Sequence, residues 1–303
     1  MLGCCLGRNQ IHDEEELESP TRPTSNEELK FNIQKQLVKT RRHNHIGYGI
    51  SSNVFKINVN FSNFSCKIIK ENWKKETQNE INVLRNIKLL NTDFFPKIQC
   101  SFNLNECKVI CYDYIEGTDL QNLISEKNPF EYKENDIIYL TYQILRGLQE
   151  LLRLDYVHLD LKPENIIISS LNPIKITIID LSFTENYKDN NGKKNKVQGT
   201  IGYISPEILL YKTFYKNTDI WSLGIIIYLL YTSTFIFGID EETYTNNIES
   251  SECVHNLVLN SQNKLSLELQ NIVSKCLEYN AINRISVNSL INIFYSIKDL
   301  YIE

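Results

Sequence analysis

Residues 157–165 read V-H-L-D-L-K-P-E-N and combine an acid, a cation and an amide at fixed spacing, in Asp160, Lys162 and Asn165. Phosphoryl transfer uses these three groups, because a carboxylate orients the attacking hydroxyl, an ammonium neutralises the moving phosphate and an amide oxygen binds a metal. The alternative is a polar turn between a helix and the apolar run Ile166–Ile168. The spacing H-x-D-x-K-x-x-N favours the chemical interpretation, because it rarely arises by chance.

Two further sets of residues in the first half of the chain suit the same chemistry. Gly47 and Gly49 lie between two strand patterns, where glycines let a backbone approach phosphates closely, although a plain hairpin turn would look the same. Lys67 lies in the strand pattern at 64–69, where a lysine is usually just a solvated side chain. Glu80 lies on the helix that follows and can pair with Lys67.

Hydrophobic periodicity indicates the elements that must position these residues. The first half predicts one helix over 74–90 and strands within 46–57 and at 64–69, 98–102 and 108–112. From residue 119 onward helical patterns dominate, with helices predicted at 135–154, 218–231, 267–277 and 287–300 and a short strand pair at 166–168 and 174–179. The pattern therefore predicts an α+β protein whose first part is strand-rich and whose second part is mainly helical.

Composition excludes several classes of protein. The 303 residues suffice for one large domain or two lobes, and the formal net charge of −5 with no large basic block gives no indication of a nucleic-acid partner. The eight cysteines form no C-x-x-C pair and no secretory signal peptide is present, which predicts reduced thiols in a cytoplasmic protein. The apolar run Leu223–Tyr231 is far too short to span a membrane.

Residues 1–40 are expected to form a disordered, acidic tail. Residues 1–28 hold two arginines and seven acidic residues, so they carry the whole formal net charge. Cys4 and Cys5 suit S-palmitoylation and hence peripheral membrane association, because two acyl chains give stable anchoring. An untethered end is the alternative, and the acidic charge counts against tight docking to an anionic leaflet.

The motifs follow one order along the chain and together resemble the eukaryotic protein kinase family over about residues 43–300. The segment 162–165 is similar to the form found in serine/threonine kinases, and the whole loop is similar to that of some calmodulin-dependent-type kinases. The set that carries the resemblance is Gly47, Gly49, Val54, Lys67, Glu80, His158, Asp160, Lys162, Asn165, Asp180, Gly199-Thr200, Ser205-Pro206-Glu207, Asp219 and Arg284.

The resemblance implies a bilobal protein-kinase-like fold in residues 41–300, with an N-lobe at about 41–114 and a C-lobe at about 117–300. It also implies ATP and Mg²⁺ as cofactors and a protein substrate phosphorylated on Ser or Thr. A small-molecule kinase is the weaker alternative, because Ser205-Pro206-Glu207 together with Arg284 belongs to the protein-substrate type.

In such a kinase the first half of the chain would hold the nucleotide. Gly47 and Gly49 would cover the phosphates and Val54 the adenine, while Lys67, positioned by Glu80, would hold the α- and β-phosphates.

The hinge and the residues beyond it would complete the nucleotide site. The resemblance places the hinge at Asp113 to Ile115, whose backbone would hydrogen-bond the adenine. It also lets Asp119 reach the ribose and places Ile167 under the adenine.

The catalytic roles come from the same resemblance. Asp160 would orient the substrate hydroxyl and accept its proton, Lys162 would neutralise the γ-phosphate, and Asn165 and Asp180 would bind magnesium. Two structural roles are also implied, because Glu207 would pair with Arg284 and Asp219 would brace the catalytic loop.

The chain departs from the family pattern in three motifs. Ser52 replaces a loop glycine, Leu181-Ser182 replaces Phe-Gly after Asp180, and Leu159 replaces the arginine that normally receives an activation-loop phosphate. The departures at Ser52 and Ser182 leave one alternative open, a pseudokinase that acts as a nucleotide-binding scaffold. Transfer of the γ-phosphate to a generic basic protein, measured for the wild type and for Asp160→Asn, distinguishes an active kinase from such a scaffold.

The departure at Leu159 bears on regulation. The polar stretch 188–196 is expected to be a mobile loop, and Lys188–Gln198 contains no Ser, Thr or Tyr. Both halves of a phosphate switch are therefore missing, which predicts a kinase that is active as synthesised.

Overall fold

The computed structural model describes residues 25–39, 44–48, 52–126, 134–261 and 265–301. The expectations for Cys4, Cys5 and Gly49 lie outside these residues. The chain divides into two compact units. The first contains the chain up to Lys88 together with Pro96–Ile115, and the second contains Leu89–Phe95 and the chain from Glu116 onward. These units are the strand-rich and the mainly helical lobe that the sequence predicts.

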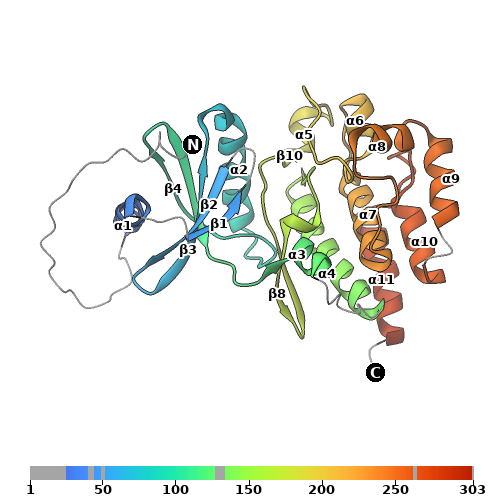
Figure 1. Cartoon of the computed structure of the whole chain (residues 1–303), viewed down its shortest axis with the longest axis horizontal. Coiled ribbons are helices and arrows are strands. Elements are labelled where there is room, and N and C mark those ends of the chain that lie inside the picture. Colours follow the sequence, from blue (N-terminus) through green and yellow to red (C-terminus); the bar gives the residue numbers. More distant parts are fainter. Residues whose placement is uncertain (1–24, 40–43, 49–51, 127–133, 262–264, 302–303) are drawn as a thin grey trace, which may run out of the picture. The chain divides into compact units, whose positions relative to one another are not determined.

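A five-stranded antiparallel sheet forms the first unit (Figure 1). Strands β2 and β3 are joined by Asn60 and Phe61, which both have positive φ angles, as in the tight turns that match the twist of a hairpin. In sheet order the strands are β1 (His45–Tyr48), β2 (Ser52–Val59), β3 (Ser62–Ile69), β5 (Cys107–Asp113) and β4 (Ile98–Leu104).

Helices cover both faces of this sheet. Side chains alternate along a strand, so Cys66 and Lys67 of β3 face opposite sides. The face that carries Lys67 meets α2 (Lys74–Lys88), which follows a short 3₁₀ turn, η2 (Glu71–Trp73). The other face carries an apolar cluster that includes residues of β2, β3, β4 and β5.

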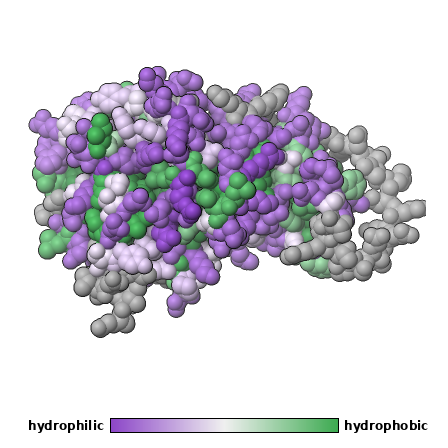
Figure 2. All heavy atoms as spheres, turned by 180° about the vertical axis from the view of Figure 1, so that it is seen from behind, coloured by the Kyte–Doolittle hydropathy of each residue, from purple (hydrophilic) through white to green (hydrophobic). Residues whose placement is uncertain are grey.

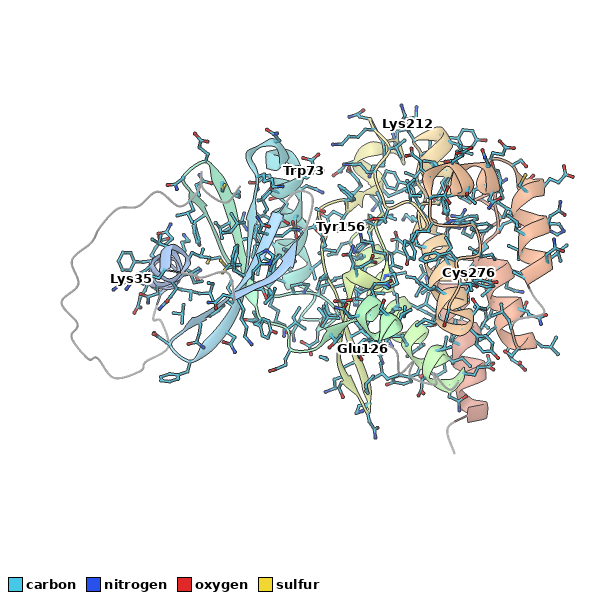
Figure 3. The ribbon with its side chains drawn as sticks, viewed as in Figure 1. Lys35, Trp73, Glu126, Tyr156, Lys212 and Cys276 are labelled. Atoms are coloured by element: carbon cyan, nitrogen blue, oxygen red, sulfur yellow. The ribbon has the colours of Figure 1, made fainter. Side chains whose placement is uncertain are left out.

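The tail boundary predicted at residue 40 is wrong, because helix α1 (Asn26–Lys39) covers the apolar cluster. Leu29, Ile33 and Leu37 are buried against β2 and β4, whereas Lys35 marks the exposed face of the helix (Figure 3). Leu29, Ile33 and Leu37 recur at every fourth position, but this apolar period covers only three residues of a mostly polar segment, so composition alone suggests a tail. Packing on the sheet, and not intrinsic propensity, stabilises it.

The second unit is built around helix α7 (Thr218–Thr232), in which every residue from Thr218 to Leu230 is buried. Gly224 allows α10 to approach closely, because a Cβ at this position would lie 2.7 Å from Cβ of Cys276. The other helices are α3 (Leu120–Ser125), α4 (Glu134–Arg153), α5 (Tyr187–Asn190), α6 (Pro206–Tyr211), α8 (Glu241–Ile248), α9 (Ser251–Ser261), α10 (Leu267–Cys276) and α11 (Val287–Tyr301).

Two small sheets of this unit position the catalytic loop. One contains β6 (Thr118–Asp119), β8 (Ile166–Leu171) and β9 (Ile174–Ile178), and the other pairs β7 (Tyr156–Val157) with β10 (Glu185–Asn186). The 3₁₀ turn η3 (Pro163–Asn165) lies between β7 and β8.

The loop predicted to be mobile at 188–196 is instead docked on the segment that follows α6. Gly192 has a φ of 70° and accepts a hydrogen bond from the backbone of Phe214 at 2.7 Å, while the backbone of Lys194 donates to Lys212 at 2.8 Å. A Cβ on Gly192 would lie 2.3 Å from the carbonyl oxygen of Phe214. The prediction of a mobile loop is therefore wrong, because backbone pairing that polar composition does not reveal fixes the segment.

The surface drawn in Figure 2 is mostly hydrophilic, with hydrophobic side chains visible in places. No helix in the described parts of the chain combines the length and apolar character needed to cross a membrane.

Candidate active site

The first unit contains a buried ion pair between β3 and α2. Lys67 Nζ lies 2.9 Å from Oε2 and 3.1 Å from Oε1 of Glu80, and the two side chains are 5% and 3% exposed. The pairing expected from the sequence is therefore present. The ion pair fixes the position of the ammonium on the sheet face, so that it can hydrogen-bond a phosphate.

The other nucleotide-binding candidates of this unit lie on strands. Gly47 pairs with Val54 across β1 and β2, and Ser52 is a buried residue of β2 that pairs with Ile69. Ser52 has no positive φ, so this conformation does not require the glycine that the family pattern has there.

The hinge candidates lie at the end of β5. The backbone N–H of Asp113 donates to Lys97 at 3.2 Å, and its carboxylate accepts from Gln99 at 2.9 Å. The carbonyl oxygen of Asp113 is the group that the hinge role requires. Ile115, two residues further on, is the last residue of the first unit.

In the second unit Asp219 of α7 holds the backbone of the catalytic loop. Its two carboxylate oxygens accept the N–H groups of His158 and Leu159, each at 2.8 Å. These bonds stabilise Leu159 at a φ of 68°, a conformation that costs a leucine free energy. Burial raises the pKa of Asp219, and the two backbone N–H groups oppose that rise.

His158 fixes the loop from within. It is fully buried, its Nε2 lies 3.3 Å from the carbonyl oxygen of Ile179, and its Nδ1 lies 3.3 Å from the N–H of Asp160. A neutral ring with its proton on Nε2 satisfies both bonds, since Nε2 then donates and Nδ1 accepts.

Asp160, Thr200 and Lys162 form a hydrogen-bonded chain. The Thr200 hydroxyl donates to Oδ1 of Asp160 at 2.7 Å and accepts from Nζ of Lys162 at 2.9 Å. Burial raises the pKa of Asp160, while the Lys162 charge and the Thr200 bond oppose the rise. The group is a carboxylate poised to accept a proton beside an ammonium that can neutralise negative charge.

Asn165 and Asp180 supply oxygen atoms next to this chain. The Asn165 amide nitrogen donates to the Asp160 carbonyl oxygen at 2.9 Å, so its amide oxygen is the atom left to offer a metal. Asp180 follows β9 with a φ of 59°. Amide and carboxylate oxygens are the ligands that Mg²⁺ prefers, so the residues present fit this ion.

The turn after Asp180 departs from the family pattern without visible strain. Leu181 is 1% exposed, and Ser182 has no positive φ. Serine therefore fits this conformation, which does not need the backbone freedom of glycine.

Asp119 and Ile167 pair across β6 and β8, so the structure brings these two candidates together. The Asp119 carboxylate also caps α3, since it accepts the backbone N–H of Asn122 at 2.8 Å. Its position thus has a structural cause in addition to the ribose contact that the resemblance implies.

Comparison with known proteins identifies the constellation. A model described as the protein kinase domain matches residues 40–296. The chain belongs to the protein kinase family.

Several kinases resemble the chain over most of that domain. It is 31% identical to human myosin light chain kinase family member 4 over 219 residues, which cover 70% of this chain and 54% of that protein. It is 30% identical to calcium-dependent protein kinase 5 of Plasmodium berghei (strain Anka) over 84% of this chain and 45% of that protein. It is 33% identical to serine/threonine-protein kinase 17A of Oryctolagus cuniculus over 46% of this chain and 35% of that protein.

The matched regions make up 35–54% of the length of these three kinases. Their own activities and substrates are therefore properties of longer proteins.

The kinase domain contains a buried lysine that the sequence does not single out. The Lys194 side chain is 2% exposed, its Nζ lies 3.9 Å from Oε1 of Glu185, and no hydrogen-bond acceptor among the described residues reaches it. The Phe214 ring lies 5.9 Å away. Sequence analysis places Lys194 in a mobile basic loop, and only the docking of that loop buries it.

Burial lowers the pKa of Lys194 to about 8. An unfolded lysine titrates near 10.4, so between these two values the unfolded chain binds a proton that the folded chain does not, and stability rises with pH. We expect Lys194→Met to be more stable than the wild type at pH 7, by up to about 3 kcal/mol, with the difference vanishing near pH 10. Urea unfolding at pH 7 and at pH 10 measures both values.

The matched control is Lys175→Met, which changes an exposed lysine of β9. It should alter stability by less than about 0.5 kcal/mol at either pH. A Lys194→Met variant less stable than the wild type at pH 7 would show that the attraction to Glu185 outweighs the cost of burial.

The pair of Glu207 and Arg284 is also present and has two bonds. Arg284 NH1 and NH2 donate to the two carboxylate oxygens of Glu207 at 2.7 and 3.0 Å, and Thr218 donates to Glu207 at 2.9 Å. Arg284 also donates to the carbonyl oxygens of Glu278 and Tyr279. These bonds join α6 to α7 and to the segment that follows α10, so the role of the pair is structural.

Proposed function

We propose that the chain is a serine/threonine protein kinase that transfers the γ-phosphate of ATP to a protein hydroxyl. The observation that carries this proposal is the chain of hydrogen bonds from Asp160 through Thr200 to Lys162. It joins a base and a cation through a residue 38 positions away from Lys162, an arrangement with no evident use in a scaffold. The relatives named as serine/threonine-protein, myosin light chain and calcium-dependent protein kinases support the same class.

Each residue of this hydrogen-bonded set has a defined part in the transfer. The Asp160 carboxylate orients the substrate hydroxyl and accepts its proton, and its raised pKa strengthens it as a base. The Lys162 ammonium neutralises charge that develops on the transferred phosphoryl group. The Thr200 hydroxyl fixes the distance between these two groups, so neither must reorganise during the reaction.

The nucleotide and the metal have separate sets of residues. Lys67, held by Glu80, binds the α- and β-phosphates of ATP, and Asn165 and Asp180 hold Mg²⁺, which neutralises phosphate charge when bound. Gly47, Gly49, Val54, Asp113, Ile115, Asp119 and Ile167 complete the nucleotide-binding set that the resemblance implies.

The pseudokinase alternative rests on Ser52 and Ser182. Neither residue adopts a positive φ, so neither substitution strains this conformation. The residues assigned to phosphate and metal are all of the required chemical type. The active kinase is therefore the better-supported function.

We also propose that the kinase needs no phosphate on its activation segment, the residues between Asp180 and Glu207. The segment is docked through backbone hydrogen bonds, from Phe214 to Gly192 and from Lys194 to Lys212, so contacts within the chain supply the order that a phosphate would otherwise provide. Leu159, in the place of the receiving arginine, is 4% exposed and presents no charge.

One experiment tests both proposals. The purified full chain is treated with a broad-specificity phosphatase, the phosphatase is removed, and transfer from γ-labelled ATP to a generic basic protein is followed with phosphoamino-acid analysis. We expect label on Ser or Thr at a rate within about twofold of the untreated enzyme, and a rate about 10²–10⁴-fold lower for Asp160→Asn.

The outcomes separate the hypotheses. No transfer above the Asp160→Asn background, with nucleotide still bound, would establish the scaffold instead of the kinase. A tenfold loss after phosphatase treatment would leave the kinase in place and overturn phosphate-independent activity, with Thr184 and Thr200 the first positions to map.

A further inference from the structure

Three cysteines lie side by side in a row across the sheet of the first unit. The strand order β3, β5, β4 places Cys66 opposite Cys111 and Cys111 opposite Cys100. All three belong to the apolar cluster on the face away from Lys67. We call Cys66, Cys111 and Cys100 the thiol row.

The sulfur atoms of the thiol row are in contact. Cys66 Sγ lies 3.2 Å from Cys111 Sγ, and Cys111 also hydrogen-bonds Cys100. Directly opposed residues of neighbouring strands have Cα atoms about 4.5–5.5 Å apart, within the range of about 4.4–6.8 Å that a disulfide bridges. Either neighbouring pair can therefore be joined with little movement of the backbone.

The three thiols differ in character. The hydrogen bond from Cys111 lowers the pKa of Cys100, and the Lys30 charge on α1 lowers it further, although burial opposes both. Hydrogen bonds to its two neighbours and burial raise the pKa of Cys111 well above the ordinary value. The row thus contains a thiol whose pKa is lowered beside one whose pKa is raised, which suits a nucleophile and a resolving partner.

Helix α1 controls access to the thiol row. Cys66 and Cys111 are 0% exposed and Cys100 is 6% exposed, beneath the helix that contributes Leu29, Ile33 and Leu37 to the same cluster (Figure 1). Among the described residues no group of three or more His, Cys, Asp or Glu side chains is arranged to hold a metal ion. Thiol oxidation is the chemistry left to the row.

We propose that the thiol row is an oxidation site. A peroxide converts Cys100 and Cys111 to a disulfide, and this disulfide can then exchange so that Cys111 is linked to Cys66 instead. The site depends neither on ATP nor on the catalytic loop. The disulfide would link neighbouring strands of the sheet that carries Lys67. Lys67 follows Cys66 in β3, and its side chain lies on the opposite face of the sheet.

The reaction is balanced. The Cys100 thiolate attacks one peroxide oxygen, the O–O bond breaks, and the leaving hydroxide takes a proton to become water. The Cys111 sulfur then attacks the Cys100 sulfenic acid, the S–O bond breaks and a second water leaves. Two thiols have lost two electrons and two protons to one peroxide. The Cys66 sulfur can attack the Cys111 sulfur next. Its proton passes to the released Cys100 sulfur, so one disulfide and one thiol are conserved.

The test uses the full chain with Cys4→Ser and Cys5→Ser, so that the two terminal cysteines cannot contribute. Hydrogen peroxide is added, remaining thiols are blocked, and tryptic peptides are mapped by mass spectrometry without reduction. Cys66, Cys100 and Cys111 fall in three different tryptic peptides. We expect Cys111 linked to Cys100 or Cys66, with a loss of about 2 Da from the intact chain.

Two variants give the proposal its controls. Cys111→Ser should abolish both links, because Cys111 is the middle member, whereas Cys276→Ser on α10 should leave them unchanged (Figure 3). Cys276 is fully buried, and burial raises its pKa to about 12, so it has no thiolate to offer. Peroxide that oxidises other thiols while the row stays unlinked would overturn the proposal.

A second pair of variants tests the role of α1. Ile33→Ala removes a buried side chain of the helix, and Phe31→Ala removes one that is 65% exposed. Weaker docking raises the population in which the row is open, so Ile33→Ala should speed disulfide formation by at least about tenfold. Phe31→Ala should leave the rate within about twofold. Equal rates for both variants would show that peroxide reaches the row without release of α1.

Discussion

Asp180→Asn is expected to lower phosphoryl transfer by about 10²–10⁴-fold while the protein stays as stable as the wild type. The change removes the negative charge that we propose holds the metal but keeps the shape of the side chain. Asparagine is the right replacement because Asp180 has a φ of 59°, which asparagine adopts readily and alanine does not. Transfer of γ-labelled phosphate and thermal unfolding, measured on one preparation, separate activity from folding.

The matched control is Glu268→Gln, an acid-to-amide change at an exposed position of α10. It should leave both rate and stability unchanged. A wild-type rate for Asp180→Asn would contradict the assignment of this residue to the metal.

Lys67→Met is a less clean test, and the structure gives the reason. Lys67 and Glu80 are both buried, so removal of the lysine leaves a buried carboxylate without its partner. This variant should lose activity and stability together, and only the loss of activity bears on phosphate binding.

Arg284→Ala should lower the free energy of unfolding by about 3–5 kcal/mol, because it leaves the Glu207 carboxylate buried without its cation. It also removes the donors to the carbonyl oxygens of Glu278 and Tyr279, and the stacking of Arg284 at 5.2 Å from the Trp221 ring. Urea unfolding measures the loss, and the activity of the folded fraction should be retained.

Three further variants separate charge from geometry. Arg153→Ala breaks an ion pair with Glu150 in which the arginine is 61% exposed, and it should cost less than about 1 kcal/mol. Arg284→Lys keeps the charge but loses the two-bond geometry and should fall between the two alanine variants.

The double change Glu207→Gln with Arg284→Met removes both charges and should recover part of the stability that Arg284→Ala loses. It also remains informative if Arg284→Ala does not fold. A double variant as unstable as Arg284→Ala would show that the unpaired carboxylate is not the cause of the loss.

Much of the candidate site follows from the sequence because its groups are close along the chain. Asp160, Lys162 and Asn165 lie within six residues, and the turn that holds them forms locally. The helix that carries Glu80 and the strand that carries Lys67 each have a clear apolar period, so their pairing could be expected without knowledge of the fold. Ser205-Pro206-Glu207 and Arg284 required the family pattern, since 77 residues separate Glu207 from Arg284.

The tertiary structure decided what lies next to what. Strand periodicity places Cys66, Cys100 and Cys111 in three strands, but only the sheet order β3, β5, β4 makes them neighbours. Composition gives residues 188–196 as a mobile basic loop, and the backbone pairing of Gly192 with Phe214 turns it into the ordered segment that buries Lys194. The local period of a sequence determines which elements form and which face is apolar. Pairing between distant segments depends on packing and loop closure over the whole chain, so the docking of α1, the thiol row and the burial of Lys194 became visible only in the folded protein.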